Sequence, residues 1–357
     1  MTGLVARMTR RRGLSQVRHV TPVPPSAARG LVADVYAQVE RDFGMLAPPV
    51  ALHSPAPESL AAAWAMVRES LVVSGPLDRA VKEAVATAVS QQNSCPYCVD
   101  VHGTMAHGLM AERDAAAVNG GRIEEIADVA IRRAVAWARG DLDDMPVPAE
   151  QAPELWGTAV TFQYLNRMVN VFLPDGLFPA GAAVPRRLIG VLARPLVRRM
   201  SGPGAAVRLL PPAPIPDDLH WASESVALRE GFAAAYAVME EAGARAVPDD
   251  VRELVLGQLA LRGGRPPGLS RGWAHEAAAR LRPAERAAAR LALLTAIAAY
   301  QVDATVVDDF RRDGAGDRTL IELTAWASFT AARHWASARA QTAQTAQTAQ
   351  RQRDGKG

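Results

Sequence analysis

The chain has 357 residues and a formal net charge of only +3, which gives no strong electrostatic reason to expect nucleic-acid binding. Apolar residues make up 49% of the sequence but aromatic residues only 5%, so alanine, leucine and valine must fill the core. No stretch approaches the roughly 18 apolar residues that a membrane-spanning helix requires. This composition is typical of closely packed helices, and we expect an all-α protein of about two domains.

Residues 1–21 form a basic arm that we expect to be disordered. The arm lacks the apolar segment of a secretory signal, so a cytoplasmic location is expected. Its basic character comes from five arginines: Arg7, Arg10, Arg11, Arg12 and Arg18.

Residues 22–180 show helical periodicity and are predicted to form one helical domain. In the helix expected over 77–92, Val81, Val85 and Val89 lie on the buried face. Glu83 lies off that face, which in isolation indicates a solvent-facing charge. The predicted helices cover residues 27–40, 59–73, 77–92, 111–118, 123–140 and 152–171.

The motif of this domain is a Cys-x-x-Cys pair, Cys95 and Cys98, followed by His102. These are the two cysteines of the whole sequence. Ser94 is a plausible helix N-cap and Pro96 suits the first helical turn. On a helix, positions separated by three and four residues share a face. The two thiols would then be within reach of a disulfide, and His102 within reach of a thiol.

Physical chemistry alone leaves the nucleophile of this pair open. The positive end of the helix dipole and free backbone N–H groups favour a thiolate near Cys95. His102 is placed to take a proton from Cys98 instead, as in thiol–histidine pairs.

The two cysteines allow four other interpretations. A zinc site would use Cys95, Cys98, His102 and His107, but four ligands on one helix do not converge on a tetrahedral ion. Covalent haem attachment requires a histidine directly after the second cysteine, where this chain has Val99. A thioredoxin-like fold requires a preceding strand. The cysteines could also be inert core residues.

The spacing Glu83-x11-Cys95-x2-Cys98-x3-His102 resembles the core motif of the alkylhydroperoxidase D-like branch of the carboxymuconolactone decarboxylase family. The helix expected from residue 152 resembles the last helix of the family's domain, including its Asn-Arg pair at residues 166–167. The likeness covers roughly residues 22–180 and implies an all-helical fold.

The resemblance implies a dithiol peroxidase. Cys98 would attack the peroxide and Cys95 would resolve it, with His102 as proton acceptor and Glu83 behind it as a relay. The substrate would be a hydroperoxide and the reductant a lipoyl- or thioredoxin-like dithiol protein, with no cofactor required. Tyr97 departs from members that have histidine there, and it puts in doubt a second proton route. A lactone decarboxylase and a non-catalytic redox sensor or binding module are the alternatives.

Residues 181–217 are expected to form a basic, proline-rich connector. A short helix over 184–200 is predicted to pack between domains, with a membrane-surface role as the alternative. Residues 218–340 resemble a degenerate second copy of the domain without cysteines. We hypothesise that this copy takes the place of a neighbouring subunit, and a homo-oligomer remains possible. Residues 341–357 are a low-complexity tail.

Overall fold

The computed structural model describes residues 13–177, 186–197, 201–263, 265 and 267–354, and this part of the chain contains helices and no strands, which confirms the predicted all-α fold. A π-helical turn, Arg68–Val72, continues α4. The α-helices are α2 (Gly30–Phe43), α3 (Pro48–Ala51), α4 (Pro57–Val67), α5 (Arg79–Gln92), α6 (Pro96–Leu109), α7 (Glu112–Gly120), α8 (Val129–Arg139), α9 (Ala152–Phe172), α10 (Arg186–Val197), α11 (Val226–Ala246), α12 (Asp249–Arg262), α13 (Gly272–Ala278), α14 (Arg286–Ala298), α15 (Ala304–Arg311) and α16 (Asp317–Asp354).

Side-chain caps explain where two of these helices begin. Asp78 accepts a hydrogen bond of 2.7 Å from the backbone N–H of Ala80 and starts α5. Asp128 accepts one of 3.0 Å from Ile131 and starts α8. The helix predicted over 123–140 is therefore wrong at its beginning, where a short 3₁₀ turn precedes the cap.

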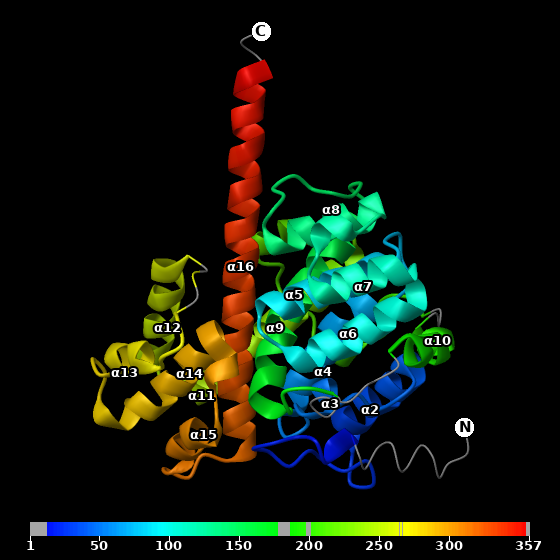
Figure 1. Cartoon of the computed structure of the whole chain (residues 1–357). Coiled ribbons are helices and arrows are strands. Elements are labelled where there is room, and N and C mark those ends of the chain that lie inside the picture. Colours follow the sequence, from blue (N-terminus) through cyan, green and yellow to red (C-terminus); the bar gives the residue numbers. More distant parts are fainter. Residues whose placement is uncertain (1–12, 178–185, 198–200, 264, 266, 355–357) are drawn as a thin grey trace.

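The helices α2–α9 form the first half of the structure and α11–α16 form the second half (Figure 1). Four helices, α4, α9, α11 and α16, make the contacts between the two halves. α4 packs against α11, α9 against α16, and α11 against α16. In Figure 1 the helices α5–α8 lie to the right of α16, and α12–α15 lie to its left. The hydrophobic core is continuous across both halves, so each half is buried partly by the other.

Aromatic rings pack at the interface between the two halves. Trp156 of α9 lies 5.9 Å, centroid to centroid, from Trp335 of α16 and 6.3 Å from Trp221. Phe329 of α16 contacts Tyr164 of α9 at 6.2 Å and Tyr236 of α11 at 4.5 Å. Edge-on and offset ring pairs stabilise an interface beyond the effect of the apolar area that they bury. The two halves therefore share a well-packed interface.

Each half has one helix at its centre. α5 packs against α6, α8 and α9, and α14 packs against α12, α13, α15 and α16. The opening helices α4 and α11 pair with each other, as do the closing helices α9 and α16. An internal duplication would produce this arrangement, and the tandem organisation stays a prediction.

A buried ion pair fixes α5 to α9. Nζ of Lys82 lies 2.8 Å from Oε2 of Glu154, and the Lys82 side chain is only 1% exposed. The same oxygen accepts a hydrogen bond of 3.0 Å from the backbone N–H of Leu77. Burial lowers the pKa of Lys82, while Glu154 raises it in part. The pair sets the position of α5, the helix that carries Glu83.

The expectation of a disordered arm over 1–21 is wrong for the residues that the structure describes. Val20 is buried, and the backbone N–H of Arg18 donates a hydrogen bond of 2.8 Å to the carbonyl of Phe172. Apolar residues such as Val20 give this segment a core contact that the arginine cluster conceals. Residues 1–12 of the arm lie outside the described part of the chain.

The basic helix of the connector is observed as α10, but it does not pack between the halves as predicted. It lies against α6, the helix of the cysteine motif. The two backbones approach closely at Gly108 and Gly190: a Cβ added to Gly108 would lie 2.3 Å from the carbonyl oxygen of Gly190. Asp100 of α6 also forms a salt bridge with Arg186 of α10. Two glycines thus allow a contact that the hydrophobic pattern does not indicate.

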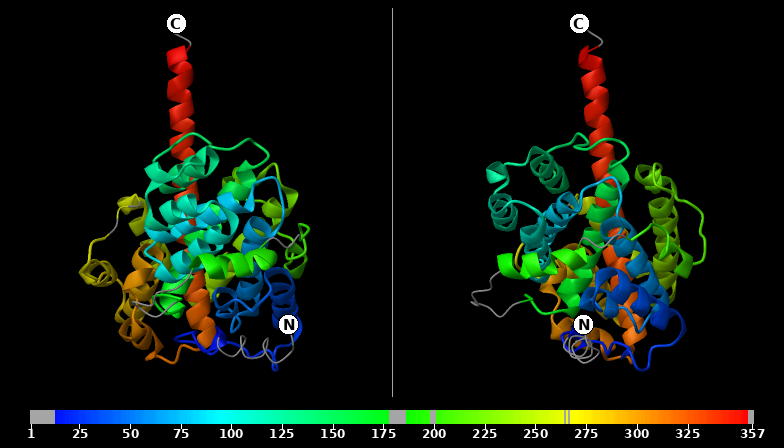
Figure 2. Two further views of the ribbon diagram at one scale, coloured as in Figure 1. Left: turned by 45° about the vertical axis from the view of Figure 1, so that its right-hand side comes forward. Right: turned by 90° about the vertical axis from the view of Figure 1, so that its right-hand side faces the viewer.

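The low-complexity tail is helical up to Asp354 and belongs to α16, whose C-terminal end projects beyond the other helices (Figure 2). The repeated alanine and glutamine residues have good helix propensity and no glycine or proline interrupts them before residue 355. Across the described residues, no helix combines the length and apolar character needed to cross a membrane.

Candidate dithiol active site

The two cysteines lie at the junction between α5 and α6. Cys95 itself, and not Ser94 as predicted, is the N-cap residue of α6, and Pro96 takes the first helical position as expected. Ser94 instead makes the turn, with a left-handed φ of 49°. The backbone N–H of Cys95 donates a hydrogen bond of 2.9 Å to the carbonyl of Ser90, which ties the turn to the end of α5.

The sulfur atoms of Cys95 and Cys98 lie 2.7 Å apart and both residues are free thiols. Both are almost fully buried, at 1% and 4% exposure. They stand three positions apart at the start of α6, and their contact agrees with the predicted shared face of the two cysteines. A disulfide bond measures about 2.05 Å, so little movement is needed to join the two sulfurs.

His102 and Glu83 form a second pair. Nδ1 of His102 lies 2.7 Å from Oε2 of Glu83, and His102 is 8% exposed. The Glu83 side chain is fully buried, so the solvent-facing position that periodicity suggested for it in isolation is wrong. A carboxylate at this position holds the proton on Nδ1 of the ring and leaves Nε2 as the acceptor.

Arg79 completes this arrangement. Its guanidinium contacts Oε1 of Glu83 through Nε at 2.8 Å and Nη2 at 2.7 Å. Burial alone would raise the pKa of Glu83, but Arg79 and then His102 outweigh burial and lower it. Glu83 is therefore a buried anion that bridges a guanidinium and an imidazole.

The two pairs are not joined directly. Among the described residues, neither cysteine sulfur forms a hydrogen bond with His102. The ring of Phe162 from α9 packs edge-on against His102 with the centroids 4.4 Å apart, which restricts the orientation of the imidazole. A direct proton transfer from Cys98 to His102 therefore requires the thiol and the imidazole to move into hydrogen-bond contact.

The pKa of the Cys98 thiol depends on its burial and on its contact with Cys95. Burial, followed by the adjacent sulfur of Cys95, raises the pKa of the Cys98 thiol well above its usual range. Two sulfurs this close share one negative charge at most, because a second thiolate would be repelled in a site of low polarity. Ionisation of Cys98 therefore needs a base.

Tyr97 lies between the two cysteines in the sequence. Its hydroxyl donates a hydrogen bond of 3.3 Å to Oε1 of Gln16 from the N-terminal segment, and its side chain is buried. Burial and the neighbouring sulfurs raise the pKa of Tyr97. The phenol therefore stays protonated at neutral pH and does not act as a base. This agrees with the expectation that Tyr97 provides no second proton route.

Neither of the two interpretations of His107, a zinc ligand or a surface histidine, fits the described structure. Its side chain is only 9% exposed, and Nδ1 lies 3.3 Å from Oε2 of Glu112. Within the described ranges, no cluster of three or more histidine, cysteine or carboxylate side chains is arranged to hold a metal ion.

Sequence reasoning missed two residues that shape the site, Arg79 and Phe162. Arg79 stands four residues before Glu83 on one helix, and that spacing is a recognisable signal for an ion pair. Phe162 reaches His102 from another helix, and no local spacing in the sequence indicates this contact.

Comparisons with known proteins agree with the motif. A family model described as the carboxymuconolactone decarboxylase family matches residues 58–140, which include all four motif residues. The protein named alkyl hydroperoxide reductase Rv2159c, from Mycobacterium tuberculosis, is 38% identical over 335 residues, which covers 91% of this chain and 96% of that relative. No solved structure matches the chain at a significant level.

Proposed function

The chain belongs to the carboxymuconolactone decarboxylase family, and from this premise we propose that it is an alkylhydroperoxidase-like enzyme that reduces hydroperoxides through a Cys95–Cys98 disulfide cycle. The name of the mycobacterial relative, which aligns over nearly its whole length, supports hydroperoxide reduction at the level of the family. The observation that carries the dithiol cycle is the 2.7 Å separation of two free thiols beside a buried His102–Glu83 pair.

The cycle begins with loss of the Cys98 proton to Nε2 of His102. The Cys98 thiolate attacks one peroxide oxygen, an S–O bond forms, and the O–O bond breaks. The leaving alkoxide takes a proton from His102 and departs as an alcohol. Cys98 is now a sulfenic acid, oxidised by two electrons, and the peroxide has been reduced by two.

Cys95 resolves this intermediate. Its sulfur attacks the sulfur of Cys98, a disulfide forms, and the hydroxyl of the sulfenic acid leaves as water. A dithiol reductant then returns two electrons and two protons by thiol–disulfide exchange and is itself oxidised to a disulfide. We propose a lipoyl- or thioredoxin-like protein as that donor, acting in a reducing compartment such as the cytoplasm.

Glu83 acts through His102 in this scheme. When His102 becomes an imidazolium, the buried carboxylate stabilises the charge at a distance of 2.7 Å. Arg79 keeps Glu83 ionised, because its guanidinium is the largest influence that lowers the pKa of this carboxyl. We propose that the three side chains form a relay that accepts the thiol proton and returns it to the leaving oxygen.

The test is peroxide consumption in the presence of a dithiol reductant such as dithiothreitol, with wild type, Cys98→Ser and Cys95→Ser. Repeated turnover by wild type, no reaction with Cys98→Ser and one oxidation per chain with Cys95→Ser support the proposal. A single oxidation per chain in wild type would instead indicate a redox sensor. If wild type and both variants are equally inactive, the disulfide cycle is wrong for this chain.

A further inference from the structure

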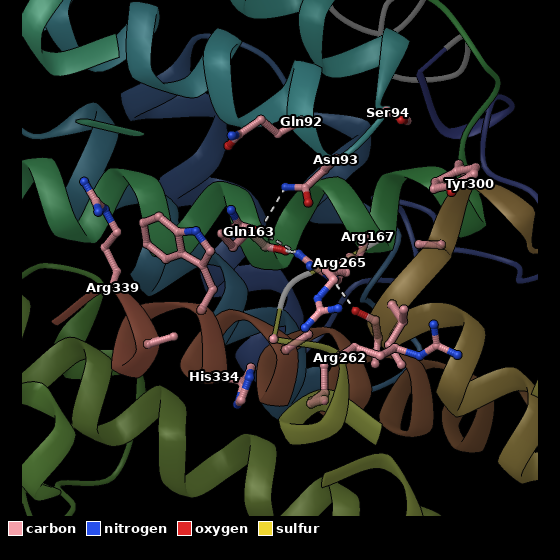
Figure 3. A pocket seen from close by; sticks show the side chains of 18 of the residues that line it. Gln92, Asn93, Ser94, Gln163, Arg167, Arg262, Arg265, Tyr300, His334 and Arg339 are labelled. Atoms are coloured by element: carbon pink, nitrogen blue, oxygen red, sulfur yellow. Dashed lines mark hydrogen bonds between the residues drawn. The ribbon is translucent and has the colours of Figure 1, made fainter. Parts of the chain in front are cut away.

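A cavity of about 560 Å³ lies at the interface between the halves, and neither cysteine is among its described lining residues (Figure 3). Its walls come from the end of α5, from α9, and from α12, α14 and α16 of the second half. The volume is in the range of small-molecule sites in proteins. Neither the dithiol cycle nor the His102 relay uses any of the residues that line it.

The charge of this cavity has one sign. No aspartate or glutamate is among its described lining residues, whereas four arginines are. One of them, Arg339, is neutralised by Asp143 at 2.8 Å. The other three, Arg167, Arg262 and Arg265, form no ion pair with any described carboxylate. The cavity therefore holds three positive charges without a counter-charge from the described chain.

Arg167 is the most enclosed of the three. Its Nε donates a hydrogen bond of 2.9 Å to the carbonyl of Ala296, and its Nη1 donates one of 2.9 Å to Oε1 of Gln163. Both partners are neutral. Burial lowers the pKa of Arg167 to about 10, which reflects the cost of a desolvated cation without an anion beside it. Figure 3 shows Arg167 and Arg265 near the middle of the cavity.

Arg262 lies at the end of α12, and its guanidinium stacks on the ring of Trp273 at 4.4 Å. The stacking fixes the plane of the group, yet its buried Nε has no hydrogen-bond partner among the described residues. A fixed guanidinium with an unused donor suits a planar oxyanion that accepts two parallel hydrogen bonds.

The rest of the wall is mostly apolar. Leu259, Ile297 and Trp335 line the cavity together with several alanines, and Gln163 and Asn93 supply amide groups on one side. An inorganic anion would leave this apolar area uncovered, whereas a ligand with a hydrocarbon body would bury it.

We propose that this cavity is a binding site for an amphipathic organic carboxylate. The carboxylate lies among Arg167, Arg262 and Arg265, and the hydrocarbon part lies on Leu259, Ile297 and Trp335. Neither cysteine lines the cavity, and the test of this site does not depend on peroxidase activity.

The test is calorimetric titration of the reduced full-length protein with decanoate, decanol and inorganic phosphate. Arg262→Gln and Arg265→Gln remove single charges, and Arg208→Gln is the matched control because Arg208 is exposed and lies outside the cavity. Arg265 is also exposed, so its variant is expected to fold even if Arg262→Gln does not.

We expect saturable binding of one decanoate per chain, about tenfold weaker in each cavity variant and unchanged in Arg208→Gln. Decanol and phosphate should each bind at least tenfold more weakly than decanoate. Decanol lacks the carboxylate that the arginines bind, and phosphate lacks the hydrocarbon chain that covers the apolar wall. Equal decanoate affinity in wild type and Arg265→Gln, or phosphate binding as tight as that of decanoate, would overturn the proposal.

Discussion

The imidazole of His102 and the carboxylate of Glu83 meet at 2.7 Å, although they come from different helices and stand 19 residues apart in the chain. Glu83 is fully buried and is held on its other side by Arg79. A buried anion in this position orients the imidazole of His102 and sets which ring nitrogen is free. This relationship connects the motif to its proposed chemistry.

Replacement of His102 by glutamine should lower kcat/KM for peroxide by about 10²- to 10⁴-fold, because a positioned general base is lost. His107→Gln is the matched control, since His107 lies on the same helix and pairs with a different carboxylate, Glu112. Steady-state peroxide consumption measures both. Equal losses in the two variants would show that the effect is structural.

Glu83→Gln should reduce kcat/KM about 10²-fold and lower the free energy of unfolding by about 2 kcal/mol, because Arg79 and His102 lose a buried anionic partner. Urea unfolding and steady-state kinetics measure the two effects. Glu112→Gln, whose carboxylate is half exposed, should change the free energy of unfolding by less than about 0.5 kcal/mol.

The effect of Glu83 on stability should depend on pH with a definite sign. Its pKa in the folded protein is lowered from the ordinary value of 4.5, so its contribution is complete above that value. The contribution is lost as the pH falls through the folded pKa, where the carboxyl takes up a proton. The stability difference between wild type and Glu83→Gln should therefore be constant above about pH 5.5 and shrink in more acid solution. A difference that grows on acidification would contradict the assignment.

The Cys95→Ser variant should have a lower pKa for Cys98 than wild type. In wild type, burial and then the sulfur of Cys95 raise the pKa of Cys98, and the substitution removes the second influence. A serine hydroxyl can also donate a hydrogen bond to the thiolate. Titration of the ultraviolet absorbance of the thiolate measures the shift, and an unchanged or higher pKa would contradict a coupled pair.

Gly108→Ala should destabilise the protein by about 1–3 kcal/mol, because its methyl group would collide with the backbone of Gly190 on α10. Gly257→Ala is the matched control: it also lies within a helix, and nothing stands within 4 Å of the added carbon. The control should stabilise the protein by about 0.5–1 kcal/mol through helix propensity. Thermal unfolding of both variants measures these effects. An unchanged stability of Gly108→Ala would show that α10 does not pack closely against α6.

The sequence allowed correct prediction of those features that depend on local spacing. The helices follow from apolar periodicity, and the contact between Cys95 and Cys98 follows from their separation of three residues. The burial of Glu83 was not evident from its helix alone, since it lies off the apolar stripe. Its partner His102 belongs to another helix, and only the motif spacing indicated the contact.

Features that depend on contacts between distant segments escaped prediction. α10 packs on α6 because two glycines face each other, Gly108 and Gly190, and these are 82 residues apart. The three arginines of the cavity without an ion pair come from α9, from the end of α12 and from the residues that follow α12, and no local pattern joins them. Ser94 resembles an N-cap by type, yet the backbone must turn there to bring Cys95 onto α6.

The most direct test of the dithiol cycle is to locate the first oxidised sulfur. Each single-cysteine variant is treated with one equivalent of hydrogen peroxide, trapped with a sulfenic-acid reagent and examined by peptide mass spectrometry. The account predicts a trapped sulfenic acid on Cys98 in Cys95→Ser and none on Cys95 in Cys98→Ser. Trapping on Cys95 in Cys98→Ser, with Cys98 unmodified in the other variant, would contradict it.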